Sequence, residues 1–214
     1  MSRNYGKQVA CDHYFQRSYL NADRWSSYWY QIDAVLQLGG RSILEIGIGN
    51  RVVCDTLAKI GLSVTTLDIE PGLHPDAVGS VTMLPFAAKI FDVVVAAEIL
   101  EHIAWEDLTL ALAEIRRVTR RAALISVPNA GYTFACDWKL PLIPRQRWIW
   151  RLPRFWRRHR FDGEHYWELG KRGFTLNLFI RIIQQSGFRL LGHELWPDDP
   201  VHHYFLLELD ESDV

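Results

Sequence analysis

Short apolar runs rich in β-branched residues alternate along this chain with longer runs of helical period. The short runs predict strands at residues 42–46, 63–67, 78–83, 91–96 and 122–127. Three consecutive valines, Val93 to Val95, are typical of a strand covered on both faces. Helical spacing predicts helices over 52–60 and 105–119, between the strands. This alternation indicates a parallel sheet with helices on both of its faces.

The two ends of the chain extend this pattern. Before the first strand, the aromatic-rich stretch 13–38 runs into a helix that we expect to end at Gly39. After the fifth strand, a helix is expected over 176–186, followed by strands at 188–193 and 203–209. Only a short turn separates the last two strands, which leaves no room for a crossover helix. We therefore expect these two strands to pair antiparallel.

The composition is that of one globular domain. The chain has 214 residues, of which 49% are apolar and 23% charged, and no apolar run reaches the ~20 residues of a membrane span. Residues 1–12 are polar and lack the apolar stretch of a secretory signal. The three cysteines lie far apart without CxxC spacing, and the adjacent His202 and His203 point to opposite faces of a strand. We expect a cytoplasmic protein without a disulfide framework or a bound metal.

Positive charge is concentrated in one segment. Residues 138–161 hold eight basic residues and no acidic one, so the rest of the chain carries −9, eight below the total of −1. Prolines at 141, 144 and 153 prevent one continuous helix, and we expect an irregular flap over the mouth of a cleft. The flap could be merely solvated, bind an anionic substrate through arginine, or contact a membrane surface through arginine and tryptophan. The near-neutral total charge argues against a nucleic-acid partner.

A glycine turn follows the first predicted strand. Gly47 and Gly49 stand just after Glu45, and glycines at this point let the backbone approach a ligand closely. Asp68 ends the next strand, about twenty residues on, where a carboxylate accepts hydrogen bonds from ribose hydroxyls. The Glu45 carboxylate would repel a pyrophosphate and attract a sulfonium or amino group. This combination favours a nucleoside cofactor with a positive charge over a dinucleotide.

These segments resemble the motifs of class I S-adenosylmethionine-dependent methyltransferases, in the branch called methyltransferase type 11. The first motif resembles Leu-Glu-Ile-Gly-Ile-Gly at residues 44–49, and the second resembles Thr-Leu-Asp-Ile at 66–69. The later motifs of the branch are similar to residues 84–86, 91–95, 98–102, 125–129, 164–168 and 173–188. The resemblance implies an α/β fold: a Rossmann-like three-layer sandwich with a seven-stranded, mostly parallel sheet ending in an antiparallel strand.

The resemblance also implies the cofactor, S-adenosyl-L-methionine, and the residues that bind it. These are Glu45, Gly47, Gly49, Asp68 and Glu98. The chain departs from the pattern at Arg51, where a third glycine is usual, and at Ser80, where an acidic residue commonly meets the adenine amino group. We expect the helix after the glycine turn to start slightly later, and groups near Ser80 and Val81 to contact the adenine.

Two histidines are candidate general bases. His102 lies one helical turn after Glu98, which turns it toward the same cleft. His165 and Glu168 stand at i and i+3 after the basic segment, where they could serve as a base and its orienting group. For both histidines, a structural hydrogen bond that fixes a loop is the alternative interpretation.

The sequence therefore predicts one methyltransferase domain over 1–214. It consists of a helical cap (1–40), a cofactor-binding core (41–129), a basic and aromatic flap (130–172) and a C-terminal helix with an antiparallel strand pair (173–214). The expected acceptor is a small molecule, sugar or lipid, anionic if the flap binds it. Two alternatives stay open: an inactive methyltransferase-like binding protein, and an NAD(P)-dependent oxidoreductase, against which Glu45 and the antiparallel end of the sheet argue.

Overall fold

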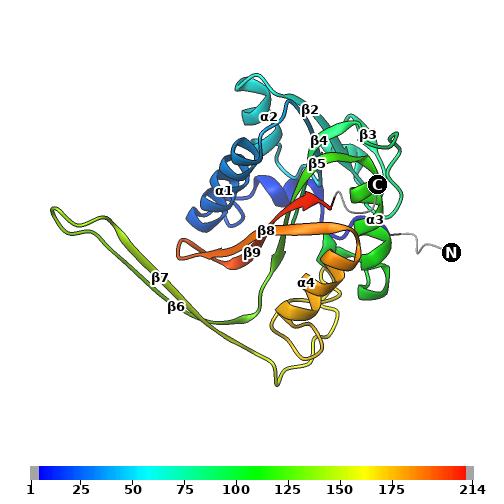
Figure 1. The fold of residues 1–214 in the computed structure, drawn as a ribbon. Helices are drawn as coiled ribbons and strands as arrows, with labels where there is room; N and C mark the ends of the chain where they lie inside the picture. The colour runs from blue at the N-terminus through cyan, green and yellow to red at the C-terminus, as the bar shows by residue number, and fades with distance from the viewer. Residues whose placement is uncertain (1–4, 211–214) are drawn as a thin grey trace.

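The computed structural model describes residues 5–210 and contains a seven-stranded sheet in the order β3-β2-β1-β4-β5-β9-β8 (Figure 1). The strands are β1 Ser42–Ile46, β2 Ser63–Asp68, β3 Ala77–Val78, β4 Phe91–Ala97, β5 Thr119–Pro128, β8 Phe188–Trp196 and β9 Asp199–Leu209. Neighbouring strands pair parallel except at β9, which is antiparallel to both β5 and β8. The mostly parallel sheet and the antiparallel C-terminal pair are confirmed.

Helices cover both faces of this sheet, as the alternation of elements predicts (Figure 1). The helices are η1 Cys11–Phe15, α1 Ala22–Leu38, α2 Val52–Lys59, η2 Pro71–Leu73, η3 Leu100–His102, η4 Trp105–Asp107, α3 Leu108–Val118 and α4 Leu176–Gln185, where η marks 3-10 helices. One core joins α1 and α2 to the sheet, and the other joins α3 and α4 to it. Val93 lies in the first core and Val94 in the second, both without exposed surface, as expected for a central strand between two helical layers.

Two predicted elements are shorter in the structure. The strand expected over 78–83 is reduced to Ala77–Val78, followed by an isolated bridge between Ser80 and Met83. The helix expected over 105–119 begins with the 3-10 turn η4, and α3 starts only at Leu108. In the first case the Ser80 hydroxyl hydrogen-bonds Thr82 within a turn, which competes with the strand.

The predicted irregular flap is wrong, because much of this segment is a regular hairpin. Strands β6 Gly131–Trp138 and β7 Gln146–Pro153 pair antiparallel and project away from the sheet (Figure 1). Prolines 141 and 144 lie in the connecting loop and Pro153 lies at the strand end, positions that do not interrupt the pairing. The prolines exclude a helix, as expected, but they do not exclude a two-stranded ribbon.

Within residues 5–210, no helix combines the length and the apolar character that crossing a membrane requires.

Candidate cofactor and active site

A cavity of about 360 Å³ lies at the carboxyl ends of β1, β2 and β4. The residues that the sequence analysis assigned to the cofactor or to catalysis all line it: Glu45, Gly47, Gly49, Asp68, Ser80, Val81, Glu98, His102 and His165. The parallel sheet accounts for this convergence, because its strands deliver their carboxyl ends to one edge. The placement fits the predicted site, whereas the role of each residue stays a prediction.

The glycine turn after β1 has the left-handed backbone that favours glycine. Gly47 has a φ of 80°, and the next residue, Ile48, donates its N–H to the Asp68 carboxylate at 3.0 Å. Arg51, where a third glycine is usual, also has a positive φ, 66°, and α2 begins directly after it at Val52. The turn is therefore completed without the third glycine.

Glu45 has a buried carboxylate in the wall of the cavity. Only 4% of its surface is exposed, and its Oε2 has no hydrogen-bond partner among the described residues. Burial raises the pKa of Glu45 to about 8, although a hydrogen bond from Cys54 and the charge of Arg51 act in the opposite direction. A buried carboxylate oxygen without a partner is costly, so this site suits a cationic group on a ligand.

The second wall of the cavity comes from β2 and the turn after β3. Burial raises the pKa of Asp68, while the backbone N–H groups of Glu70, at 2.9 Å, and Ile48 favour its charged form. The Ser80 hydroxyl lies 2.9 Å from the Thr82 hydroxyl and is therefore used within its own turn. That groups near Ser80 and Val81 contact the adenine stays a prediction.

A buried charge network lies across the cavity. The Glu98 carboxylate accepts the Ser126 hydroxyl at 2.6 Å and pairs with Nε2 of His202, whose Nδ1 lies 2.7 Å from Asp199. Burial alone lowers the pKa of His202, but these two carboxylates raise it to about 10. His202 is thus a buried imidazolium between two carboxylates, and it ties β9 to the end of β4.

The two candidate bases meet in one corner of the cavity. The rings of His102 and His165 lie 5.2 Å apart, and Glu101, only 1% exposed, lies beside both. Burial, followed by the nearby Glu98 carboxylate, raises the pKa of Glu101 to about 8. Burial also lowers the pKa of His102, whereas the Glu168 carboxylate offsets burial and raises the pKa of His165. A neutral His102 can accept a proton, as a general base requires.

The fold of this chain is shared with solved methyltransferases. Residues 44–127 match the family described as a methyltransferase domain. These residues are thus identified as a methyltransferase domain, and the chain has the fold of the class I S-adenosylmethionine-dependent methyltransferases.

Individual relatives of this methyltransferase are distant. Over 163 residues it is 27% identical to the ubiquinone biosynthesis O-methyltransferase of Azorhizobium caulinodans, and the match covers 68% of this chain but 63% of that protein, less than two thirds of its length. The solved 1,6-didemethyltoxoflavin-N1-methyltransferase of Burkholderia thailandensis, 14% identical, superposes with a TM-score of 0.61 over 92% of this chain and 82% of that one. The N-methyltransferase NodS of Bradyrhizobium japonicum, 13% identical, gives a TM-score of 0.58 over 90% of each chain. At these identities, the structures show a shared fold.

S-adenosylmethionine is the cofactor of this methyltransferase, and the cavity fits its chemical groups. The unpartnered Glu45 oxygen suits a positive charge, and Asp68 suits ribose hydroxyls. At Gly47 an added side chain would collide with Ile99, and the positive φ of 80° also favours glycine at this turn.

The sequence analysis missed one wall of the cavity. Side chains from the N-terminal segment and α1 close it: Tyr14, Tyr19, Arg24 and Tyr28. The Arg24 guanidinium lies 4.5 Å above the Tyr19 ring, and the Tyr28 hydroxyl accepts the Asn50 amide at 2.8 Å. The aromatic content of this stretch was visible in the sequence, but which rings face the cavity depends on how α1 packs against the sheet.

The hairpin does not contribute to the cavity. The residues lining it include none of 138–161, although all of that segment is described. The expectation that the segment covers the mouth of the cleft is therefore wrong. Arg147 instead pairs with Asp198 beside the β8–β9 turn, and Arg145 pairs with Asp137 of the hairpin itself.

Proposed function

We propose that this methyltransferase methylates a hydroxyl oxygen of an amphiphilic small molecule and meets it at a membrane surface. The observation that carries the methyl-transfer part is the unpartnered, buried Oε2 of Glu45 beside the glycine turn. S-adenosylmethionine supplies an electrophilic methyl group that passes to a nucleophile and leaves S-adenosylhomocysteine. The name of the relative in Azorhizobium caulinodans, an O-methyltransferase of ubiquinone biosynthesis, supports oxygen as the methylated atom.

Different residues of the cavity bind the two reactants, the cofactor and the methyl acceptor. In this proposal Glu45 binds the positively charged group of the cofactor and Asp68 binds its ribose hydroxyls. Glu98 lies between the bound cofactor and the acceptor. His102 accepts the proton that the acceptor hydroxyl loses, because burial keeps its imidazole neutral. Positioning in a closed cavity supplies much of the rate of such a displacement.

Binding experiments test the cofactor part. S-adenosylhomocysteine should raise the melting temperature of the protein, since a ligand selective for the folded state stabilises it. Stabilisation by NADH without stabilisation by S-adenosylhomocysteine would contradict the proposal and favour an oxidoreductase. Binding without methyl transfer to any of a panel of phenols, catechols and quinols would favour the inactive binding protein.

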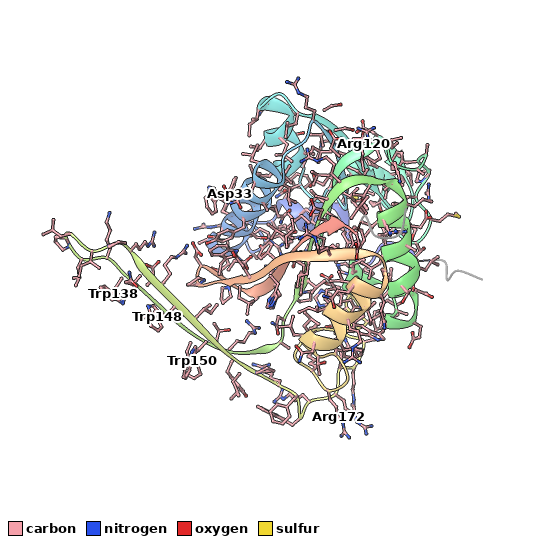
Figure 2. The ribbon with its side chains drawn as sticks, viewed as in Figure 1. Asp33, Arg120, Trp138, Trp148, Trp150 and Arg172 are labelled. Atoms are coloured by element: carbon pink, nitrogen blue, oxygen red, sulfur yellow. The ribbon has the colours of Figure 1, made fainter. Side chains whose placement is uncertain are left out.

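The membrane part rests on the two faces of the β6–β7 hairpin. Alternate residues place aromatic and aliphatic side chains on one exposed face: Tyr132, Phe134, Trp138, Trp148, Trp150 and Leu152. The opposite face carries Thr133, Asp137, Arg147 and Arg151, and two of its arginines contact the body of the protein: Arg147 at Tyr30 and Asp198, Arg151 at the Pro200 carbonyl. Figure 2 shows Trp138, Trp148 and Trp150 along this projecting ribbon, away from the sheet.

Charge favours a lipid surface over a second copy of the chain. The loop at the tip exposes Leu140, Leu142 and Ile143 between Lys139 and Arg145. Residues 131–153, the hairpin itself, hold four basic residues and one acidic residue, Asp137, so pairing two such hairpins would bring two net positive charges together. Tryptophan with surrounding arginine and lysine is typical of segments that lie in the interface of an anionic bilayer. The unpaired Cys11, Cys54 and Cys136 fit the cytoplasmic side, which we include in the proposal.

Sedimentation with vesicles tests the membrane part. The protein should bind vesicles that contain phosphatidylglycerol more strongly than vesicles of phosphatidylcholine alone, and the binding should weaken with salt. Trp148→Ser together with Trp150→Ser should reduce it, whereas Trp25→Ser, a matched exposed tryptophan on α1, should not. Unchanged binding by the double variant, or dimers that disappear with it, would contradict a lipid-binding hairpin.

A further inference from the structure

We propose that two copies of this protein form a symmetric dimer in which their α1 helices pack antiparallel. The interface is the α1 stripe, which we define as Trp25, Trp29, Ile32 and Leu36. Trp25 and Trp29 are 53% and 57% exposed, Leu36 is 46% exposed, and Ile32 is partly buried. Contiguous exposed apolar side chains commonly mark an interaction site.

The stripe lies on the side of α1 that does not face the sheet. The residues that α1 buries in the body of the protein are Ser27, Tyr28, Tyr30, Gln31, Ala34 and Val35. Figure 2 shows Asp33, the neighbour of Ile32, on the outer side of this helix. A surface helix usually has one apolar stripe, which faces the core, so a second stripe requires a second partner.

The spacing of the stripe indicates that this partner is another helix. Its residues follow one another at intervals of four, three and four positions, the spacing of helices that pack side by side along their length. The residues that flank it are polar: Ser26, Asp33 and Gln37. Insertion into a bilayer would bury these polar groups, whereas a helix that covers only the stripe leaves them in water.

The stripe is complementary to itself when two helices run antiparallel. Because it is symmetric about a point between residues 30 and 31, Trp25 of each copy faces Leu36 of the other, and Trp29 faces Ile32. Each large ring then meets a smaller aliphatic side chain, as in well-packed cores. A parallel pairing would instead place tryptophan against tryptophan and bring the two Asp33 carboxylates to the same level of the helix pair.

The size of the stripe indicates how strong the dimer is. An aromatic side chain buries about 150–250 Å², so the half-exposed tryptophans of two copies would contribute roughly 300–500 Å². Specific interfaces bury about 1,200–2,000 Å² in total. We therefore expect a reversible dimer with a Kd on the order of 10 μM.

The same helix supplies part of the cavity wall. Arg24 and Tyr28 line the cavity, and both belong to α1. Pairing of the α1 helices therefore restrains the helix that carries these side chains, and the two cavities of the dimer adjoin one interface.

Sedimentation equilibrium without lipid, from about 1 to 500 μM protein, tests the dimer. We expect a monomer–dimer equilibrium, and at least about tenfold weaker association for Trp25→Ser together with Trp29→Ser, because tryptophan is prominent among the residues that dominate interface energies. Trp148→Ser together with Trp150→Ser is the matched control. It removes two tryptophans that are 64% and 78% exposed on the hairpin, and it should dimerise like the wild-type protein.

A nitroxide label on Gln37→Cys tests the antiparallel arrangement, in a protein where Cys11 and Cys136, the cysteines that are not buried, are replaced by serine. Position 37 then faces position 24 of the other copy, so the two labels lie roughly 20 Å apart along the helix axis. In a parallel pair they would lie side by side. Electron paramagnetic resonance distinguishes these separations, and side-by-side labels would contradict the antiparallel dimer.

Three further outcomes would overturn the proposal. The wild-type protein could stay monomeric up to about 500 μM, the α1 double variant could dimerise with unchanged affinity, or this variant could lose vesicle binding, which would assign the stripe to the bilayer. If the α1 double variant fails to fold, Leu36→Glu, a single exposed substitution, takes its place. A monomeric protein that binds S-adenosylhomocysteine would refute the dimer and leave the proposed function intact.

Discussion

The carboxylate of Asp68, at the end of β2, accepts the backbone N–H of Ile48 in the glycine turn at 3.0 Å. This bond ties the part of the cavity expected to meet the ribose to the part expected to meet the rest of the cofactor. A hydrogen bond to a charged group contributes about 1.5–3 kcal/mol, and roughly 1.4 kcal/mol corresponds to tenfold in affinity. Asp68→Ala should therefore weaken S-adenosylhomocysteine binding at least about tenfold by calorimetry.

A charge-matched control accompanies this variant. Asp55, on the outer side of α2, has a side chain that is 54% exposed. Asp55→Ala removes the same charge outside the cavity and should leave the affinity unchanged. Equal losses in both variants would mean that Asp68 acts through net charge alone.

Glu45→Gln should change stability and cofactor binding in opposite directions. The pKa of Glu45 is raised to about 8 by burial, above its unfolded value, so the folded state favours the neutral acid. Its contribution to stability is present at acidic pH and is lost as the pH rises through 8. The variant should therefore raise the melting temperature of the ligand-free protein more above pH 8 than at the acidic end, while it weakens S-adenosylhomocysteine binding. A melting temperature that gains equally at both pH values would contradict a buried, titrating Glu45.

Removing His202 should destabilise the fold. His202→Gln leaves Glu98 and Asp199 buried without the imidazolium between them. Breaking a buried ion pair on one side lowers the free energy of unfolding by about 3–5 kcal/mol, which urea titration measures. His193→Gln, on the edge strand β8, serves as the control and should cost far less. A loss of similar size in both variants would show that the charge network contributes little.

The hairpin should be dispensable for the cofactor site. Replacing residues 132–152 by a short glycine-serine linker removes the exposed aromatic face, and none of these residues lines the cavity. We expect unchanged S-adenosylhomocysteine affinity by calorimetry and lost vesicle binding by sedimentation. Weaker cofactor binding would reveal a connection between hairpin and cavity that the described contacts do not contain.

Local sequence patterns predicted the parts of the fold that local patterns determine. The apolar row at Val93 to Val95 predicted a central strand, and the short link before His203 predicted an antiparallel partner. The glycine turn and Asp68 were found because their chemistry requires particular residue types at a fixed distance. These features depend on few residues that are close in the chain or follow a known spacing.

The features that the sequence did not predict depend on contacts between distant segments. His202 was set aside as one of two adjacent histidines, yet its partner Glu98 is brought to it by the β5–β9 pairing. The hairpin was missed for a different reason. The prolines and arginines favoured an irregular flap. Phe134 and Trp150, however, belong to an alternation of period two that predicts a strand with one apolar face.

In the chain, the hairpin lies between the end of β5 and His165, so it is one contiguous insertion between two parts of the body. Its strands pair with each other and with no strand of the sheet among the described residues, and side chains of the hairpin, Arg147 and Arg151, contact Asp198 and Pro200 of the body. The length and the residues of the hairpin can therefore change in evolution without disturbing the glycine turn or the cavity carboxylates. Exchange of this one contiguous stretch of about twenty residues would change the surface that the hairpin presents and leave the cavity residues in place.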